Sequence, residues 1–107
     1  MTTFDKREEG FEKKFSLDEE QKFKATSRRN RMLGAWAAEK LGRSGDAATA
    51  YAKEVIASDF EKAGDDDVLQ KVARDFAAKS VGVDSIAIRA KMNELLAQAA
   101  AEVKAGS

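Results

Sequence analysis

The fold is decided by the stretch at residues 84–104, which reads DSIAIRAKMNELLAQAAAEVK. Its apolar side chains recur at helical spacing and fall on one face at about 100° per residue. The residues on that face are Ile88, Met92, Leu95, Leu96, Ala99 and Val103. Asp84 is suited to cap the start of this helix, and Val83 and Ile88 are placed to form a hydrophobic staple around the cap. We therefore expect an amphipathic helix that buries one face against other elements.

Two stretches further upstream repeat the helical spacing. The first has a face formed by Ala48, Tyr51, Ala52, Val55, Ile56 and Phe60, and the second has one formed by Val68, Leu69, Val72 and Phe76. Ser44 or Asp46 is suited to cap the first helix, and the aspartates at 65–67 stand where the second begins. The chain has no proline, so glycines must separate the helices, at Gly42, Gly45, Gly64 and Gly82.

Another helix precedes these, from about Phe23 to Leu41. Its core-facing side is expected to hold Phe23, Leu33, Trp36, Ala37 and Leu41. The run Ser16-Leu17-Asp18-Glu19 has the form of a capping box, in which Ser16 and Glu19 satisfy each other's backbone amides. No segment alternates with period two for long enough to form a strand. The predicted fold is all-α, with a four-helix bundle domain over residues 21–107.

The composition narrows the classes of function. The 107 residues make one domain, and 19 basic residues balance 19 acidic ones, which disfavours attraction of the whole protein to nucleic acid. Cysteine and histidine are both absent, so thiol nucleophiles, the commonest general base and the commonest metal ligand are excluded. We therefore expect neither an enzyme nor a cofactor. No apolar run is long enough to span a bilayer, and the first residues do not form a signal peptide, so we expect a cytoplasmic protein without direct membrane insertion.

Two short motifs have plainer explanations than ligand binding. The aspartates at 65–67 lack the glycine and the spaced ligands of a calcium loop, and helix capping already accounts for them. The run Gly42-Arg43-Ser44-Gly45 lacks the spacing and the lysine of a nucleotide-binding loop. We expect a helix start at the first motif and a turn between helices at the second.

The N-terminal segment, residues 1–20, differs from the rest of the chain. Residues 1–24 carry 13 charges, six basic and seven acidic, and residues 1–20 contain three phenylalanines, Phe4, Phe11 and Phe15. On a helical projection these three rings fall within about 40° of one another. Gly10 and the density of charge favour partial disorder when the protein is free. The segment is therefore predicted to be an amphipathic, partly disordered extension of the bundle.

The charges beside this aromatic stripe are sorted by sign. The acidic side is formed by Asp5, Glu8, Glu9 and Glu12, and the basic side by Lys6, Arg7, Lys13 and Lys14. This arrangement suits a helix that lies in a groove with basic residues on one wall and acidic residues on the other. The preferred interpretation is a tether that folds on its target. The competing interpretation is that the three rings extend the core of the bundle.

Several short runs of this chain are distinctive. In the first half they are Phe4-Asp5-Lys6-Arg7-Glu8, Phe11-Glu12-Lys13-Lys14-Phe15, Phe23-Lys24, Arg28-Arg29-Asn30-Arg31-Met32-Leu33-Gly34-Ala35-Trp36-Ala37-Ala38 and Leu41-Gly42. Further on they are Tyr51-Ala52, Asp59-Phe60-Glu61 and Gly64-Asp65-Asp66-Asp67-Val68. Together they resemble the zeta subunit family, which consists of small inhibitors of the F-type ATP synthase of alpha-proteobacteria. The resemblance covers roughly residues 4–76.

This resemblance implies a four-helix bundle with an inhibitory N-terminal segment. In the family, that segment is understood to enter the cleft between a catalytic subunit and its neighbour and to block rotation in the direction of ATP hydrolysis. The implied partner is the catalytic head, with its alternating catalytic and non-catalytic subunits and central stalk, at the cytoplasmic face of the inner membrane. The implied partner-binding residues are Phe4, Asp5, Lys6, Arg7, Glu8, Phe11, Glu12, Lys14 and Phe15.

Other functions compete with this one. Arg28, Arg29 and Arg31 form a local excess of positive charge, but three arginines supply few phosphate contacts, so we expect no nucleic-acid partner. The sequence leaves open whether they contact the target, weakly hold a nucleotide's phosphates or only brace the bundle. The aromatic stripe and its sorted charges would also suit a self-associating structural protein, although we expect a monomer when the protein is free.

Overall fold

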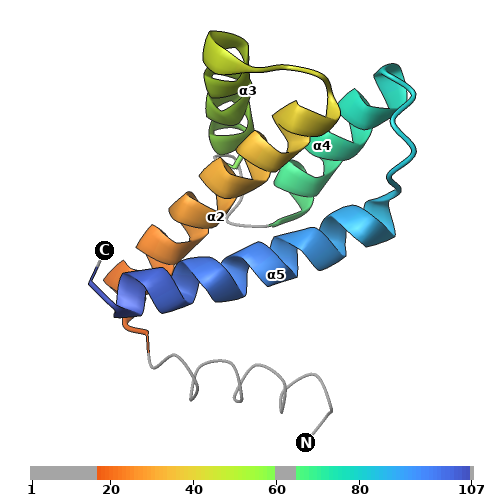
Figure 1. The fold of residues 1–107 in the computed structure, drawn as a ribbon. Coiled ribbons are helices and arrows are strands. Elements are labelled where there is room, and N and C mark those ends of the chain that lie inside the picture. The colour runs from red at the N-terminus through yellow and green to blue at the C-terminus, as the bar shows by residue number, and fades with distance from the viewer. Residues whose placement is uncertain (1–16, 60–64, 107) are drawn as a thin grey trace, which may run out of the picture.

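The computed structural model describes residues 17–59 and 65–106, and in these ranges it contains four helices and no strand. The helices are α2 (Glu19–Lys40), α3 (Gly45–Ala57), α4 (Asp65–Ala78) and α5 (Ser85–Lys104) (Figure 1). The predicted all-α, four-helix fold is confirmed. Residues 1–16 of the predicted N-terminal extension lie outside the described residues, as does Phe60, whereas Glu19 and Glu20, which were assigned to the extension, are the first residues of α2. None of the four helices is both long enough and apolar enough to cross a membrane.

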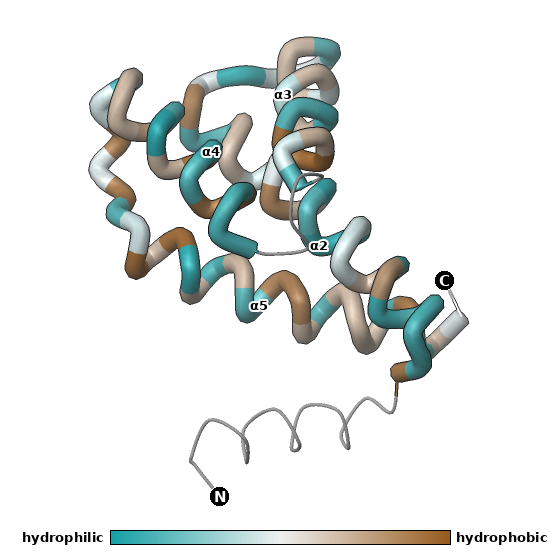
Figure 2. The backbone as a smooth tube through the Cα atoms, turned by 180° about the vertical axis from the view of Figure 1, so that it is seen from behind, coloured by the Kyte–Doolittle hydropathy of each residue, from teal (hydrophilic) through white to brown (hydrophobic). Residues whose placement is uncertain are grey.

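Helix α2 is the central element of the bundle. It packs along α3 on one side and along α5 on the other, whereas α4 makes smaller contacts with α3 and α5. The last turns of α5 return to the first turns of α2, as Figure 1 and Figure 2 show from opposite sides. Ala25, Ala99, Ala100 and Val103 form a small apolar cluster at this junction. The start of α2 is therefore fixed to the bundle by α5.

The start of α2 differs from the prediction. Asp18 is the cap: its side chain accepts a hydrogen bond of 2.8 Å from the Gln21 amide, and the Gln21 side chain accepts one of 3.1 Å from the Asp18 amide. The predicted capping box of Ser16 and Glu19 is therefore wrong, because Glu19 is the first residue of the helix. Starting at Asp18 places a carboxylate at the positive end of the helix and leaves Leu17 to pack against the small apolar cluster.

The other helix starts follow the prediction more closely. Asp84 caps α5 by accepting a hydrogen bond of 2.9 Å from the Ala87 amide, and Val83 packs against the core beside the buried Ile88. Ser44 stands at the cap position of α3, but its side chain makes no capping hydrogen bond. The aspartates at 65–67 form the first turn of α4, as expected.

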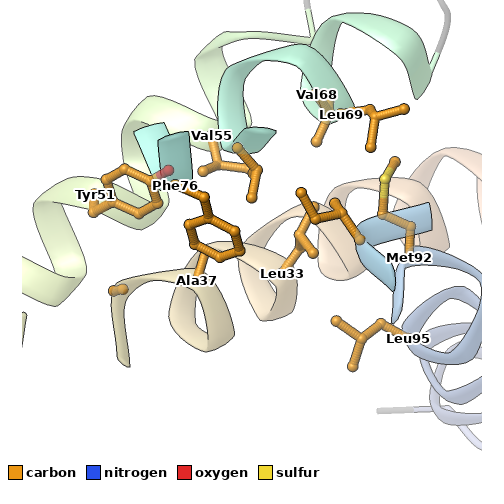
Figure 3. Packing of buried hydrophobic residues seen from close by; sticks show 12 residues of the cluster. Leu33, Ala37, Tyr51, Val55, Val68, Leu69, Phe76, Met92 and Leu95 are labelled. Carbon is orange, nitrogen blue, oxygen red and sulfur yellow. The ribbon is translucent and has the colours of Figure 1, made fainter. Parts of the chain in front are cut away.

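Side chains from all four helices converge in one apolar core (Figure 3). Its most deeply buried members are Leu33, Tyr51, Val55, Val68, Val72, Phe76, Ile88 and Met92. Trp36 is partly buried and meets Phe76 edge-to-face, with the ring centroids 5.7 Å apart. The predicted core faces of α4 and α5 are confirmed, with Leu96 only partly buried, and so is the packing role of Trp36.

Two residues predicted to lie in the core are instead on the surface. Phe23 is 72% exposed and Ile56 is 40% exposed. Helical periodicity identifies the apolar side of a helix, but it does not tell how far along that side the neighbouring helices reach. Phe23 lies near the start of α2 and Ile56 near the end of α3, where the contact between these two helices runs out.

Glycine is needed where α2 and α3 come closest. A Cβ atom on Gly34 would lie 2.6 Å from the Cα of Ala52 and 2.9 Å from its Cβ, closer than packed atoms tolerate. The bare backbone at Gly34 therefore lets the two helices touch. The turn that joins them is confirmed, with Gly42 and Gly45 at φ angles of 77° and 58°, which favour glycine.

Candidate functional site

The partner-binding residues predicted from the sequence all lie outside the described residues. They are Phe4, Asp5, Lys6, Arg7, Glu8, Phe11, Glu12, Lys14 and Phe15. The structure describes the platform to which they are joined, which is the start of α2 and the elements packed around it. The candidate functional surface is therefore built from this end of the bundle.

A buried arginine lies under this surface. Arg29 is 1% exposed, and its Nη2 donates a hydrogen bond of 2.8 Å to Oδ1 of Asp65 at the start of α4. Its Nε donates another of 2.8 Å to Oδ1 of Asn30. The hydrogen bond from Arg29 holds the pKa of Asp65 below its usual value, although partial burial acts in the opposite direction. Arg29 therefore binds α2 to α4 through a charge-assisted hydrogen bond.

The next residue holds the end of α3 in the same way. Asn30 is 2% exposed, and its side-chain nitrogen Nδ2 donates a hydrogen bond of 2.9 Å to Oδ2 of Asp59. Asp59 is the last described residue before position 60, and Asp65 is the first after position 64. Adjacent residues on α2 thus hold both ends of the connection between α3 and α4. This network keeps the three helices in register at the candidate surface.

The three arginines left open by the sequence separate into different roles. Arg29 braces the core, and Arg28 reaches across to α5, where its Nη1 lies 3.0 Å from Oε1 of Glu102. The hydrogen bond from Arg28 lowers the pKa of Glu102, assisted by one from Gln98. Arg31 is exposed on the surface. Two of the three therefore stabilise the bundle, and the third is accessible to a partner.

Phe23 and Ile56 form an exposed apolar ridge, called here the Phe23–Ile56 ridge. Together with Ser27 they are the common wall of two hollows. The larger hollow, about 470 Å³, is also lined by Glu19, Lys22, Thr26, Asn30, Asp59 and Asp65. The smaller hollow, about 290 Å³, is also lined by Lys24, Arg28 and Arg31. The ridge therefore has mainly acidic surroundings on one side and basic surroundings on the other.

The sequence analysis missed this surface because it assigned both residues to the core. A usable signal was present around Phe23. Its neighbours one and two turns along the same face of α2 are Thr26, Ser27 and Asn30, which are polar. A large aromatic side chain on an otherwise polar helix face is typical of an exposed binding residue rather than a core residue.

A second polar network lies between the middle of α3 and α4 and has a structural role. The hydroxyl of Tyr51 donates a hydrogen bond of 2.8 Å to Asp75, whose carboxylate also pairs with Lys71 at 2.8 Å. Burial raises the pKa of Tyr51, and the hydrogen bond to Asp75 raises it further. The network joins α3 to α4 and holds a neutral phenol, so it offers no activated nucleophile.

The described residues contain no group of three or more aspartate, glutamate, histidine or cysteine side chains that could hold a metal ion. At the start of α4, the carboxylates of Asp65 and Asp66 are instead engaged by arginines. Asp66 accepts a hydrogen bond of 2.8 Å from Arg89, and the other oxygen of Asp65 lies 3.8 Å from the same guanidinium.

Comparison with known proteins decides the family. A sequence profile of the family described as ATPase inhibitor subunit zeta matches residues 1–102. The chain belongs to this family. The match includes the N-terminal segment as well as the helices, so the resemblance noted from the sequence is confirmed over more of the chain than its motifs covered. Membership of the zeta family supports a role as an inhibitor of an ATPase.

A solved structure supports the same fold. A solution NMR structure matches the chain with a TM-score of 0.67 and 48% sequence identity, covering 76% of this chain and 92% of the other. At 48% identity the two proteins are similar in sequence as well as in fold. No curated protein sequence matched the chain.

Proposed function

We propose that this zeta-family protein inhibits ATP hydrolysis by the F-type ATP synthase by inserting its N-terminal segment, residues 1–20, at a catalytic intersubunit interface. The segment acts as a wedge against rotation in the hydrolytic direction. Its aromatic stripe, Phe4, Phe11 and Phe15, supplies the buried anchors, and the sorted charges on either side match the two walls of the cleft. The partner comprises the alternating catalytic and non-catalytic subunits and the central stalk.

The observation that carries this proposal is that the bundle core is closed by residues from position 25 onward. Both apolar clusters draw their buried members from α2 to α5, and only Leu17 from before α2 packs against them among the described residues. The capping box of Asp18 and Gln21 also completes the start of α2 without help from the residues before it. In the proposal, the phenylalanines of the N-terminal segment bind the partner and are not needed to complete the bundle.

In this arrangement the bundle remains outside the cleft and only the segment enters. The proposed free form is a monomer in the cytoplasm, and the bound form sits at the cytoplasmic face of the inner membrane. The proposal is tested by mixing the tagged protein with alpha-proteobacterial membranes and recovering it. Recovery of the catalytic-head subunits, together with inhibition of ATP hydrolysis, supports it. Recovery of the protein alone, or only with further copies of itself, would favour the self-associating alternative.

A further inference from the structure

We propose that the Phe23–Ile56 ridge is a second docking surface, which binds an apolar element of the catalytic head at the mouth of the cleft, with carboxylates of that element facing the smaller, basic hollow. This inference rests on the proposed function and adds to it a contact made by the bundle itself. The N-terminal segment would enter the cleft, and the ridge would hold the bundle against its rim.

The first support is the exposure of the ridge. Phe23 presents 72% of its surface to solvent, and Ile56 presents 40%, although both are large apolar side chains. No other helix of the described ranges covers them. Both side chains line the same two hollows, whose other lining residues are polar or charged, and an apolar centre with a polar rim is typical of a protein-binding site.

The second support is the reach of the chain. Phe23 follows Phe15 by eight residues. The part from Glu19 to Phe23 lies in α2 and spans about 6 Å, and the four positions from Phe15 to Glu19 add at most about 14 Å if they are fully extended. When Phe15 is anchored in the cleft, the ridge must therefore lie within the sum of these two spans from it. Ile86, another exposed large apolar side chain, belongs to the start of α5. The start of α5 lies at the opposite end of the bundle from the start of α2 (Figure 1), so Ile86 is not part of this surface.

The third support is charge. The smaller hollow beside the ridge is lined by Lys24, Arg28 and Arg31. Lys24 and Arg31 are exposed, and Arg28 is held in place by Glu102. A partner that seats an apolar side chain against Phe23 gains a favourable electrostatic contact here if it carries carboxylates on this side.

Hydrogen bonds of Asn30 and Arg29 on α2 hold the backbone beneath the Phe23–Ile56 ridge in place. Asn30 lines the larger hollow and is held by Asp59, while Arg29 beneath it is held by Asp65. A surface whose backbone is fixed before binding loses less conformational entropy when a partner docks. These contacts explain how an exposed phenylalanine near the end of a helix can act as a defined anchor.

The test compares three single variants of the full chain in an inhibition titration of ATP hydrolysis. Phe23→Ala should raise the concentration for half-inhibition by about tenfold or more, since an exposed aromatic anchor is removed. Ile86→Ala is the matched control, because it removes an exposed apolar side chain at the opposite end of the bundle, and it should leave the inhibition unchanged. Phe15→Ala reports on the proposed wedge. All three should melt at nearly the same temperature as the parent.

A photo-activated cross-linking amino acid at position 23 identifies the occupant of the ridge. Cross-links to a catalytic-head subunit are expected. Cross-links within one chain, cross-links between two copies, or no cross-link in the bound complex would each overturn the inference. If Phe15→Ala weakens inhibition and Phe23→Ala does not, the ridge fails while the proposed function stands. If only Phe23→Ala weakens inhibition, the wedge fails and the ridge is the site of docking.

Discussion

Arg29 and Asp65 lie 36 positions apart in the sequence, yet their side chains meet at 2.8 Å in the bundle. Arg29 is 1% exposed, whereas the Asp65 side chain remains 42% exposed at the start of α4. The pair therefore has one buried and one accessible partner. It holds α4 against α2 just below the surface proposed to face the ATP synthase.

Replacement of this arginine tests its bracing role. Arg29→Ala should lower the free energy of unfolding by about 2 kcal/mol, because it leaves a cavity and deprives Asn30 and Asp65 of a donor. The loss should stay below that of a fully buried ion pair because Asp65 is partly solvated. Urea unfolding followed by circular dichroism measures it. Arg31→Ala, at an exposed arginine two residues on, should change stability by less than about 0.5 kcal/mol; equal losses in the two variants would contradict the account.

Two partly buried carboxylates, Asp65 and Asp75, predict the acid limit of stability. Arg29 lowers the pKa of Asp65; burial alone would raise the pKa of Asp75, but hydrogen bonds from Lys71 and Tyr51 lower it overall. Both carboxylates therefore contribute stability that is present above the unfolded pKa of about 3.9 and is lost as the pH falls through the lower folded values.

With no histidine to titrate, the free energy of unfolding should be nearly constant from about pH 5 to pH 8. It should fall steeply below about pH 4. Denaturant titrations at a series of pH values measure this profile. A marked step in stability near pH 6 to 7 would show that an ionisable group outside these two networks controls the fold.

Helix propensity alone would predict that Gly34→Ala stabilises the protein, but the close contact between α2 and α3 predicts the opposite. Alanine is favoured over glycine within a helix by about 1 kcal/mol. Gly34→Ala should nevertheless destabilise the bundle by about 2 kcal/mol, because the new Cβ would meet the backbone of Ala52 at 2.6 Å. Gly82→Ala is the control, since a Cβ there meets nothing within 4 Å. If both variants were equally stable, the helices would be able to separate without cost.

Much of this fold was predictable from the sequence because helices are specified by local patterns. The spacing of Val68, Val72 and Phe76, for example, identifies a helix face without any knowledge of its partner, and the flanking glycines mark its limits. Burial of Arg29 was not predictable, because an arginine is ordinarily exposed and its partner comes from a distant helix. The exposure of Phe23 was not predictable either, because it depends on where another helix, α3, ends.

The candidate site likewise has one part that was predictable from the sequence and one part that was not. The aromatic stripe of the N-terminal segment is a local pattern and is visible in the sequence. The Phe23–Ile56 ridge joins residues from two helices and becomes visible only when the bundle is assembled. The cap of α2 was predicted at Ser16 and Glu19, whereas Asp18 and Gln21 form the capping box and Leu17 packs against the small apolar cluster.

The proposal that the bundle folds independently of its N-terminal segment gives another prediction. Deleting residues 1–15 should leave the melting temperature of the helical domain nearly unchanged, because the core is formed by residues from α2 to α5. Thermal unfolding followed by circular dichroism measures this. A loss of several kcal/mol would show that Phe4, Phe11 and Phe15 belong to the core, which is the competing interpretation of the stripe.

The central claim is that the aromatic stripe anchors an inhibitory wedge in the ATP synthase. Its most direct test is an inhibition titration of membrane-bound ATP hydrolysis with Phe11→Ala and Phe15→Ala, alongside proton-driven ATP synthesis. Each variant should require at least about 30-fold more protein for half-inhibition, equivalent to roughly 2 kcal/mol, and the parent protein should slow synthesis less than hydrolysis. Phenylalanine variants that inhibit hydrolysis as strongly as the parent would contradict the claim.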